Sequence, residues 1–487
     1  MAPPWPALPA FFLPILHALD RLARQRGQRV WLTGGAPRDL LLGLSPPDLD
    51  LSADGDALAL GRELAGRLGA RFIALKEDQA TGRLALGEGR FLDLVGLRAP
   101  DLAGDLRRRD FTVNALALPL SAALAGEARL IDPTGGQADL GQGLLRLAGP
   151  QSLSDDPLRV LRAFRFISSH GLRPAPGLRD QLAAAGPGLF RVARERIGQE
   201  WLKLMAGSGA ARAVLALDKA QVLTRLIPEL ARGRGLIQNP YHHLDVLRHN
   251  LATLLHLGRL VRDQSCLPPD LAREVRAYLA PERRRALLLS AALLHDLGKP
   301  ATRQDKGPGW NSFHRHDLVG AGLAVRALRG LGLGRADADW AAALVAGHMR
   351  PFHLLGATQR QGLTRRAALR LLGAAGPDLP GLFLLGLADT LAGRGPLRPP
   401  EAEERLIVLW TQVTRLRDDE LAAALAAPPL IDGRELMAAL ELAPGPEVGR
   451  LLNLVRRAQL EGQVNSREAA LALARTRRRL PGGRSSH

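Results

Sequence analysis

The chain has 487 residues, a formal net charge of +18 and a pI of about 11.3. This length accommodates roughly two to four domains, and the 46% share of hydrophobic residues is enough to form their cores. Lys and Arg outnumber Asp and Glu by 66 to 48. An enzyme of small neutral metabolites does not need this excess, so we expect a polyanionic partner, nucleic acid first and a membrane surface second. An Arg-rich composition shared by a whole proteome is the alternative explanation.

The cysteine count and the hydropathy pattern bear on the compartment. Cys266 is the only cysteine, which excludes an internal disulfide and a thiolate zinc cluster and fits a reducing cytoplasm. The apolar stretches near the N-terminus lack a preceding basic region, so they do not resemble a signal peptide. No run approaches ~18 uninterrupted apolar residues, which predicts no membrane span. We therefore expect a cytoplasmic protein.

The N-terminal third combines strand and helix patterns. Short strands are predicted at 28–33 and 91–97. Helices are predicted at 12–25 and 56–69, where apolar residues recur at helical spacing. A turn at 132–136 (Asp-Pro-Thr-Gly-Gly) ends this α/β region.

The remainder of the chain is predicted to be helical. From about residue 151 onward, Leu and Ala recur at helical spacing and strand-like alternation nearly vanishes. Gly, Pro and Asn clusters predict loops at 170–178, 232–241, 263–270, 303–312, 394–401 and 443–447. The residues after Thr476 begin with three arginines, and we expect them to be mobile and able to contact RNA.

A glycine pair followed by two carboxylates is the most informative motif. Gly34 and Gly35 leave room for backbone N–H groups to approach a triphosphate, and Arg38 offers a planar fork for phosphate oxygens. Asp48 and Asp50 are separated by one residue, so on a strand they share a face and can together hold Mg²⁺. Such a site activates a hydroxyl for attack on a phosphate. A glycine turn followed by a solvated acidic loop is the alternative.

Three further motifs follow. They occupy 105–117 (DLRRRDFTVNALA), 154–166 (SDDPLRVLRAFRF) and 191–203 (RVARERIGQEWLK). Together with the glycine and carboxylate motif, they resemble in type and order the class II tRNA nucleotidyltransferase and bacterial poly(A) polymerase family. The resemblance covers residues from about 28 to about 205. It implies a small nucleotidyltransferase head related to DNA polymerase beta, with a mixed sheet and helices.

The resemblance also implies roles for individual residues. Asp48 and Asp50 would hold the metal ions, and Asp93, on a neighbouring strand, would supply a third carboxylate. A surface position on an edge strand is the alternative for Asp93. The triphosphate and ribose of the incoming nucleotide would be bound by Gly34, Gly35, Arg38, Arg109, Asp110 and Asn114.

The base-selecting element of the family is an acidic pair followed by an arginine, here Asp155-Asp156-Pro157-Leu158-Arg159. On a helix, Asp156 and Arg159 would share a face and present acceptors and donors that read the Watson–Crick edge of ATP or CTP. A helix N-terminus with Asp caps and proline at its first position is the structural alternative, and both can hold. Arg162 and Arg165 extend a basic face that is either solvated or in contact with phosphate.

Two residues depart from the family pattern. Pro37 stands beside the phosphate-binding turn where the family usually has Val, which puts the geometry of the turn in question. Asp155 stands where the family usually has Glu, which bears on base specificity. Neither change removes a catalytic group.

A second constellation of histidines and carboxylates lies in the helical part. Its residues come from five segments: 241–249 (YHHLDVLRH), 293–299 (LLHDLGK), 313–317 (FHRHD), 347–349 (GHM) and 388–390 (ADT). These segments resemble the HD phosphohydrolase superfamily, an all-helical fold. The resemblance implies that His249, His295, Asp296 and Asp389 bind a metal, with His316 and His348 as ligands for a second metal.

Imidazole and carboxylate ligands suit a divalent transition metal, and Mg²⁺ is an alternative. Water bound to the metal would be a nucleophile for phosphoester hydrolysis. The resemblance implies 2′,3′-cyclic phosphates or 2′-phosphates at damaged RNA ends as substrates. Histidines that serve only as core or surface residues are the alternative.

The sequence thus predicts an α+β protein in four parts: a head at 1–150, a helical neck at 151–235, an HD domain at 236–395 and a helical C-terminal region at 396–487. We expect template-independent addition of C, A or both from CTP and ATP to RNA 3′ ends, with tRNA as the favoured partner, Mg²⁺ at the head and a divalent metal at the HD site. CC-only, A-only and poly(A) addition remain open. An HD phosphohydrolase with a vestigial head and a non-catalytic RNA-binding protein are the alternatives from other classes.

Overall fold

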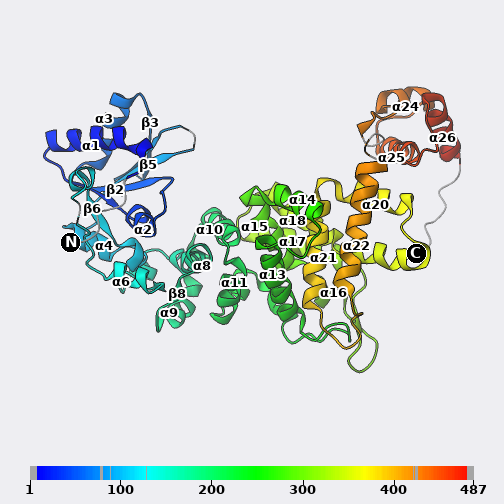
Figure 1. Ribbon diagram of the computed structural model, residues 1–487, viewed down its shortest axis with the longest axis horizontal. Coiled ribbons are helices and arrows are strands. Elements are labelled where there is room, and N and C mark those ends of the chain that lie inside the picture. Colours follow the sequence, from blue (N-terminus) through cyan, green and yellow to red (C-terminus); the bar gives the residue numbers. More distant parts are fainter. Residues whose placement is uncertain are drawn as a thin grey trace. The chain divides into compact units, whose positions relative to one another are not determined.

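The computed structural model describes residues 8–76, 80–87, 89–127, 129–420, 422 and 426–479 (Figure 1). The chain divides into two compact units, Met1–Ile227 and Pro228–His487. The first unit contains the six-stranded sheet and the helices that follow it. The second unit is helical apart from one short hairpin among its described residues.

A six-stranded mixed sheet forms the centre of the head. Its strand order is β3-β4-β5-β2-β1-β6, and β2 and β5 run parallel whereas the other neighbours are antiparallel. The strands are β1 (Val30–Thr33), β2 (Leu49–Ala53), β3 (Arg71–Lys76), β4 (Thr81–Ala85), β5 (Phe91–Gly96) and β6 (Ala117–Pro119). The predicted strands at 28–33 and 91–97 are confirmed as β1 and β5, and the predicted mixed sheet is confirmed. Strands β3, β4 and β6 were not predicted.

Alternation along the strands separates a core face from a polar face. Leu49 and Leu51 of β2, with Leu92 and Leu94 of β5, are fully buried in the main hydrophobic cluster. Side chains on a strand alternate between faces, so Asp50 lies on the other side of the sheet from these leucines. The core therefore fixes which face carries the polar residues.

Helices cover the leucine face of the sheet. Helix α1 contributes Leu16, Leu19 and Leu22, spaced at one turn of a helix, and helix α3 contributes Leu60 and Leu64. The helices of the head are α1 (Leu13–Gln25), α2 (Gly35–Leu41), α3 (Ala57–Leu68), α4 (Leu102–Arg107), α5 (Leu120–Leu124) and α6 (Gly136–Gly141). The predicted helices at 12–25 and 56–69 are confirmed as α1 and α3.

A helical neck completes the first unit. Its helices are α7 (Ser152–Asp155), α8 (Arg159–His170), α9 (Leu178–Ala185), α10 (Arg194–Ala206), α11 (Ala210–Lys219) and α12 (Leu223–Leu226), and its two-residue ladder joins β7 (Leu144–Leu145) to β8 (Arg173–Pro174). The end of α8 is fastened to α10 and α11, because the Ser168 hydroxyl donates to the Leu204 carbonyl at 2.6 Å and the Gly209 N–H donates to the Ser168 carbonyl at 2.9 Å. A Cβ on Gly209 would meet the Ser168 carbonyl oxygen at 2.9 Å, so this close approach requires glycine.

In the second unit, the region predicted to be an HD domain contains the helices α13 (Val246–Arg262), α14 (Pro269–Leu279), α15 (Glu282–Leu294), α16 (Lys299–Thr302), α17 (His316–Gly330), α18 (Arg335–Gly347), α19 (Arg350–Gln361), α20 (Arg365–Ala375) and α21 (Leu379–Ala392). A hairpin of β9 (Gln304–Asp305) and β10 (Asn311–Ser312) lies within one predicted loop. Each predicted loop overlaps a gap between successive helices.

The segment Arg365–Ala392 is long and apolar enough to cross a membrane by length and composition alone. However, 72% of its apolar window is buried inside the protein, and α21 packs against α13 and α22. A helix that is apolar all round and enclosed by protein is typical of a domain core.

The C-terminal helices are α22 (Ala402–Arg415), α24 (Gly433–Leu440), α25 (Pro446–Leu460) and α26 (Arg467–Arg479), with a π-helical turn at Leu416–Glu420. The last three share a small core that includes Leu436, Leu451 and Ala470. The prediction that the tail is mobile from residue 477 was wrong for 477–479, because α26 continues through Arg479. Residues 480–487 lie outside the described part of the chain.

Candidate active sites

Three carboxylates meet on the polar face of the head sheet. Asp50 of β2 is paired in register with Asp93 of β5, which places the two side chains on adjacent strands on the same face. Asp48 lies one residue before β2, not within a strand as predicted, and its Oδ1 accepts the Phe91 N–H at 2.9 Å. That bond ties Asp48 to the start of β5, so the carboxylates converge although only two are on strands.

The electrostatics of this group favour a bound cation. Burial raises the pKa of Asp50, and the nearby negative charge of Asp93 raises it further, although Asp50 keeps an exposed edge toward the cleft. Asp93 is held by Arg83, whose Nε and Nη2 each donate to one of its oxygens at 2.7 Å. Crowded oxygen ligands of this kind fit a hard divalent cation.

The glycine pair closes tightly over Asp50. Gly34 has a φ of 70°, and a Cβ there would meet Asp50 Oδ2 at 2.8 Å and Arg109 Nη1 at 3.2 Å. Any side chain would therefore collide with the carboxylate centre. Gly35 begins α2, and its backbone N–H donates to Asp50. Pro37 lies within α2 and does not prevent the helix from forming.

A chain of hydrogen bonds links the remaining predicted residues. Arg38 Nη1 donates to Asn114 Oδ1 at 2.6 Å, Asn114 Nδ2 donates to Asp110 Oδ1 at 3.0 Å, and Arg162 pairs with Asp110 Oδ2 at 2.7 Å. Burial alone would raise the pKa of Asp110, but Arg162 and Asn114 outweigh it and lower that pKa to about 2. Asp110 and Asn114 therefore position two arginines around the cleft.

The two other predicted arginines are fixed by the backbone or by neighbouring polar groups. Arg109 Nη2 donates to Ser52 Oγ at 3.0 Å. Arg159 Nη1 lies 3.0–3.2 Å from the carbonyl oxygens of Arg108, Arg109 and Ser152. Burial lowers the pKa of both guanidinium groups, from values so high that they stay charged near neutral pH.

The base-selecting segment differs from its predicted geometry. Helix α8 begins at Arg159, whereas Asp156 is extended between α7 and α8, so the two residues do not share a helix face. Neither does Pro157 occupy the first position of α8. Asp156 pairs instead with Arg196 of α10 at 2.7 Å, and Asp155 lies 3.5 Å from Arg108.

All of the predicted head residues nevertheless line one cavity of about 510 Å³. They are Gly34, Gly35, Arg38, Asp48, Asp50, Asp93, Arg109, Asp110, Asn114, Asp156, Arg159 and Arg162. The same cavity is lined by Arg83, Arg98 and Lys203, which sequence reasoning missed. Arg83 lies on the unpredicted strand β4, and only the strand pairing shows that it faces Asp93.

A second cluster lies among the HD helices. His249 of α13 and His295, Asp296, His316 and His348 at the ends of α15, α17 and α18 are buried, and Asp389 of α21 is half-buried. His249 Nε2 lies 2.8 Å from Asp389 Oδ1 and 3.7 Å from Asp296 Oδ2. Asp296 Oδ1 lies 3.3 Å from His316 Nε2 and 3.9 Å from His348 Nε2. All six predicted HD residues are thus brought together. Asp296 faces His249 with its Oδ2 and faces His316 and His348 with its Oδ1.

Backbone carbonyls orient three of the imidazoles. The Nδ1 atoms of His295, His316 and His348 lie 2.9, 2.8 and 2.6 Å from the carbonyl oxygens of Ala292, Phe313 and Val345 respectively. Each carbonyl is three residues earlier in the chain, at the end of a helix or in a turn. Since a carbonyl oxygen accepts a hydrogen bond, each Nδ1 carries the hydrogen, and in the neutral ring each Nε2 keeps a lone pair for the cluster.

The cluster fits divalent cations. His316 Nε2 and His348 Nε2 lie 3.2 Å apart, so their lone pairs face one another unless a cation or proton lies between them. Burial lowers the pKa of His348 to about 4, which leaves it neutral at pH 7. Neutral imidazoles with a shared carboxylate form a donor set for a metal, and the ligand atoms fall into groups that lie within 4.8 Å of one another.

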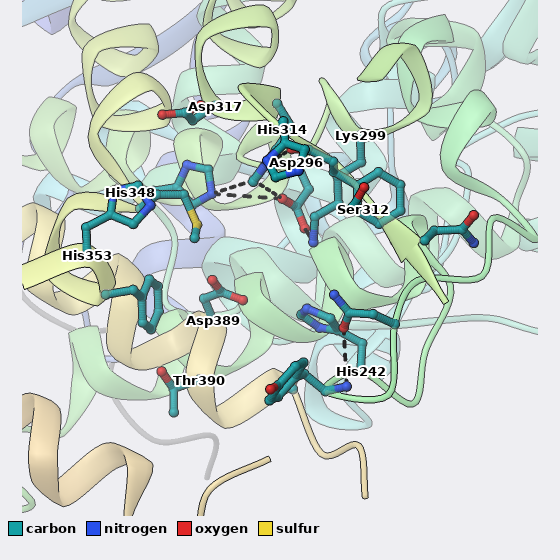
Figure 2. Close-up of a pocket in the computed structure, with 18 of the residues that line it drawn as sticks. His242, Asp296, Lys299, Ser312, His314, Asp317, His348, His353, Asp389 and Thr390 are labelled. Atoms are coloured by element: carbon teal, nitrogen blue, oxygen red, sulfur yellow. Dashed lines mark hydrogen bonds and ion pairs between the residues drawn. The ribbon is translucent and has the colours of Figure 1, made fainter. Parts of the chain in front are cut away.

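The HD cavity has a volume of about 630 Å³ (Figure 2). Figure 2 shows Asp296, His348, Asp389 and Lys299 around it. Lys299 was missed as a site residue: its Nζ lies 2.6 Å from Asp296 Oδ2 and donates to Gln238 Oε1 at 2.6 Å. The spacing of three between Asp296 and Lys299 was a usable signal, whereas nothing in the sequence indicated Gln238.

Three family models match the chain: the Poly A polymerase head domain at residues 30–146, the probable RNA and SrmB-binding site of polymerase A at 171–233, and the HD domain at 246–392. The chain is 38% identical over 447 residues to the A-adding tRNA nucleotidyltransferase of Deinococcus radiodurans, covering 91% of this chain and 94% of that protein. It is 34% identical over 446 residues to the CC-adding tRNA nucleotidyltransferase of Thermus thermophilus, covering 90% and 91% respectively.

Solved structures share the fold. An apo form of a CCA-adding enzyme superposes with a TM-score of 0.62 at 20% identity, covering 96% of this chain and 95% of that chain. The Thermotoga maritima CCA-adding enzyme complexed with tRNA superposes with a TM-score of 0.61 at 20% identity, covering 96% of each chain.

Proposed function

Because the chain belongs to the tRNA nucleotidyltransferase family, we propose that it adds C, A or both from CTP and ATP to the 3′ end of tRNA without a nucleic-acid template. The observation that carries this proposal is one head cavity in which the carboxylates of Asp48, Asp50 and Asp93, a glycine turn and seven arginines meet. The cavity thereby combines oxygen ligands for a metal with basic donors for an anionic triphosphate. The excess of Lys and Arg fits a tRNA partner, and the cytoplasm is the compartment we propose.

The proposed reaction is an in-line displacement. The RNA 3′-hydroxyl gives up its proton to solvent water and its oxygen bonds to the α-phosphorus. The bond from that phosphorus to the oxygen that bridges the α- and β-phosphates breaks, and pyrophosphate leaves with the electron pair of that bond. A divalent cation held by Asp48, Asp50 and Asp93, which we propose is Mg²⁺, would lower the pKa of the hydroxyl and offset phosphate charge. Gly34 allows the backbone to approach Asp50 and Arg109 closely, since a Cβ there would meet Asp50 Oδ2 at 2.8 Å and Arg109 Nη1 at 3.2 Å.

Base selection is assigned to Asp156 and Arg159. Arg159 is held by three carbonyl oxygens, which restricts its guanidinium to one orientation. Asp156 supplies acceptors from the extended segment just before α8. A fixed donor beside an acceptor supports hydrogen-bond reading of a base edge, which discriminates better than an apolar pocket. Arg196 holds the Asp156 carboxylate and would position it.

The test is incorporation of single labelled nucleotides into tRNA transcripts that end before CCA, after C and after CC. Addition of C, C and then A, followed by arrest, would establish complete CCA addition. Addition of A alone to the CC-ended transcript, or of C alone to the others, would establish one half of a divided activity. Open-ended A tails would replace this proposal with poly(A) synthesis, and no incorporation into any transcript would overturn the nucleotidyltransferase assignment.

A second proposed activity is phosphoester hydrolysis at the HD site. It is supported by the buried set of His249, His295, Asp296 and their neighbours, whose geometry fits divalent cations. Metal at this position would supply an activated water for attack on phosphorus. We propose 2′,3′-cyclic phosphates and 2′-phosphates at RNA ends as substrates, so that one chain would both clean and extend an RNA end.

A further inference from the structure

Two exposed aromatic side chains line the HD cavity. The exposed fractions of Trp310 and Tyr241 are 40% and 44%, and both residues line the cavity that contains Asp296 and His348. Aromatic residues make up only 4% of the chain, and it has only two tyrosines. A large aromatic ring left half in water beside a reactive centre gains little from core packing, so its flat face is available for a ligand.

The backbone holds Trp310 in a defined place. It ends the turn of the β9–β10 hairpin, where Lys306 N–H donates to the Trp310 carbonyl at 2.8 Å and Trp310 N–H donates to the Gly307 carbonyl at 2.9 Å. The next residue, Asn311, is buried, and its side-chain amide donates to the Ile237 carbonyl at 2.8 Å. The ring is therefore presented from a fastened hairpin, which lowers the entropy lost on binding.

Gln238 connects this hairpin to the cluster. Its backbone carbonyl accepts the Asn311 N–H at 3.2 Å, and its side-chain carbonyl accepts from Lys299, which in turn lies 2.6 Å from Asp296. Tyr241 lies three residues after Gln238, and its carbonyl accepts the Gly395 N–H at 2.9 Å. Two hydrogen bonds through Gln238 therefore link the hairpin that carries Trp310 to Lys299, which pairs with Asp296 of the cluster.

We propose that Trp310, with Tyr241, forms a nucleobase-stacking subsite, so that the HD site takes a phosphoester attached to a nucleoside and disfavours one without a base. This inference rests on the proposed phosphohydrolase function of the HD site. A cavity of about 630 Å³ accommodates a nucleotide. Stacking on an aromatic side chain tolerates every base, so the site would recognise an RNA 3′ end regardless of sequence.

The main experiment compares adenosine 2′,3′-cyclic phosphate with its base-free analogue, 1-O-methylribose 2′,3′-cyclic phosphate. Trp310→Ala should raise KM for the adenosine substrate by roughly 5- to 100-fold with little change in kcat, and should leave KM for the base-free analogue unchanged. Trp310→Phe should recover most of the loss, because it keeps a ring. Phe190→Ala removes an exposed aromatic ring from the other unit and should change neither value.

A binding measurement makes the outcome independent of turnover. Adenosine 3′-monophosphate should quench tryptophan fluorescence in the wild type. The quenching should be smaller in Trp310→Phe, and the difference between the two proteins reports contact of the nucleotide with Trp310. Equal effects of Trp310→Ala on both cyclic phosphates, or no such difference in quenching, would overturn the stacking subsite. If the quenching difference appears but the metal-loaded wild type hydrolyses neither phosphate, the hydrolase proposal fails and the subsite stands.

Discussion

The head and the HD domain build polar centres by different means. In the head, parallel register between β2 and β5 places Asp50 beside Asp93, and oxygen ligands face an open cleft. In the HD domain, helix ends place imidazoles whose Nδ1 atoms are held by carbonyls three residues earlier. Open oxygen ligands suit a hard cation that arrives with a charged substrate, whereas a buried imidazole cluster suits a resident metal.

The largest expected effect is the loss of nucleotide incorporation when a carboxylate of the head site is removed. Asp50→Ala removes one of three converging carboxylates, so incorporation of CTP or ATP into tRNA should fall by at least about 10³-fold. Hydrolysis at the HD site should be unaffected. Thermal unfolding should show a folded protein, and Glu63→Ala, which removes a half-exposed carboxylate of α3, is the matched control for incorporation. Substantial incorporation by Asp50→Ala would contradict the assignment of the catalytic carboxylates.

The second prediction removes a metal ligand from the HD cluster and leaves the head site intact. His249→Asn removes a ligand nitrogen that lies 2.8 Å from Asp389, and we expect metal content per chain to fall and affinity to weaken by more than about 100-fold. Incorporation into tRNA should be retained. His256→Asn changes a half-buried histidine of the same helix outside the cluster and should keep the metal. Unchanged metal content in His249→Asn, measured by elemental analysis, would contradict the ligand assignment.

A smaller effect concerns stability of the head alone. The pKa of Asp110 is lowered to about 2 in the folded protein by its arginine and amide neighbours. Because this pKa is lower than the unfolded-state value of ~3.8, the ionised Asp110 stabilises the fold by about 2 kcal/mol at pH values above ~3.8. This stabilisation is lost as the pH falls from ~3.8 toward ~2. Asp110→Asn should therefore show a weaker loss of unfolding free energy between pH 5 and pH 3 than the wild type, measured by urea denaturation. Parallel curves for the two proteins would count against this ion pair.

The comparison also shows where sequence reasoning failed. The spacing of three residues predicted that Asp156 and Arg159 share a helix face. However, α8 begins only at Arg159, and Asp156 accepts a hydrogen bond from Arg196, forty residues later. Asp156 is extended where the chain leaves α7, and the residue after it is a proline, which disfavours helical geometry at the residue before it. Both residues line the head cavity, but their hydrogen-bond partners were not predicted.

The sequence by itself determined the chemical groups. Gly34, Asp50 and the His295-Asp296 pair belong to short motifs whose geometry is largely local, because strand alternation and helix ends are local properties. Asp48 belongs to the same motif, but it lies before β2 and is held by the distant Phe91 N–H. Tertiary structure decided which groups meet. Arg38 reaches Asn114 across 76 positions and Lys299 reaches Gln238 across 61. Long cationic side chains can adopt many rotamers, and only the packing of distant elements, which buries them and demands a hydrogen-bond partner, selects one.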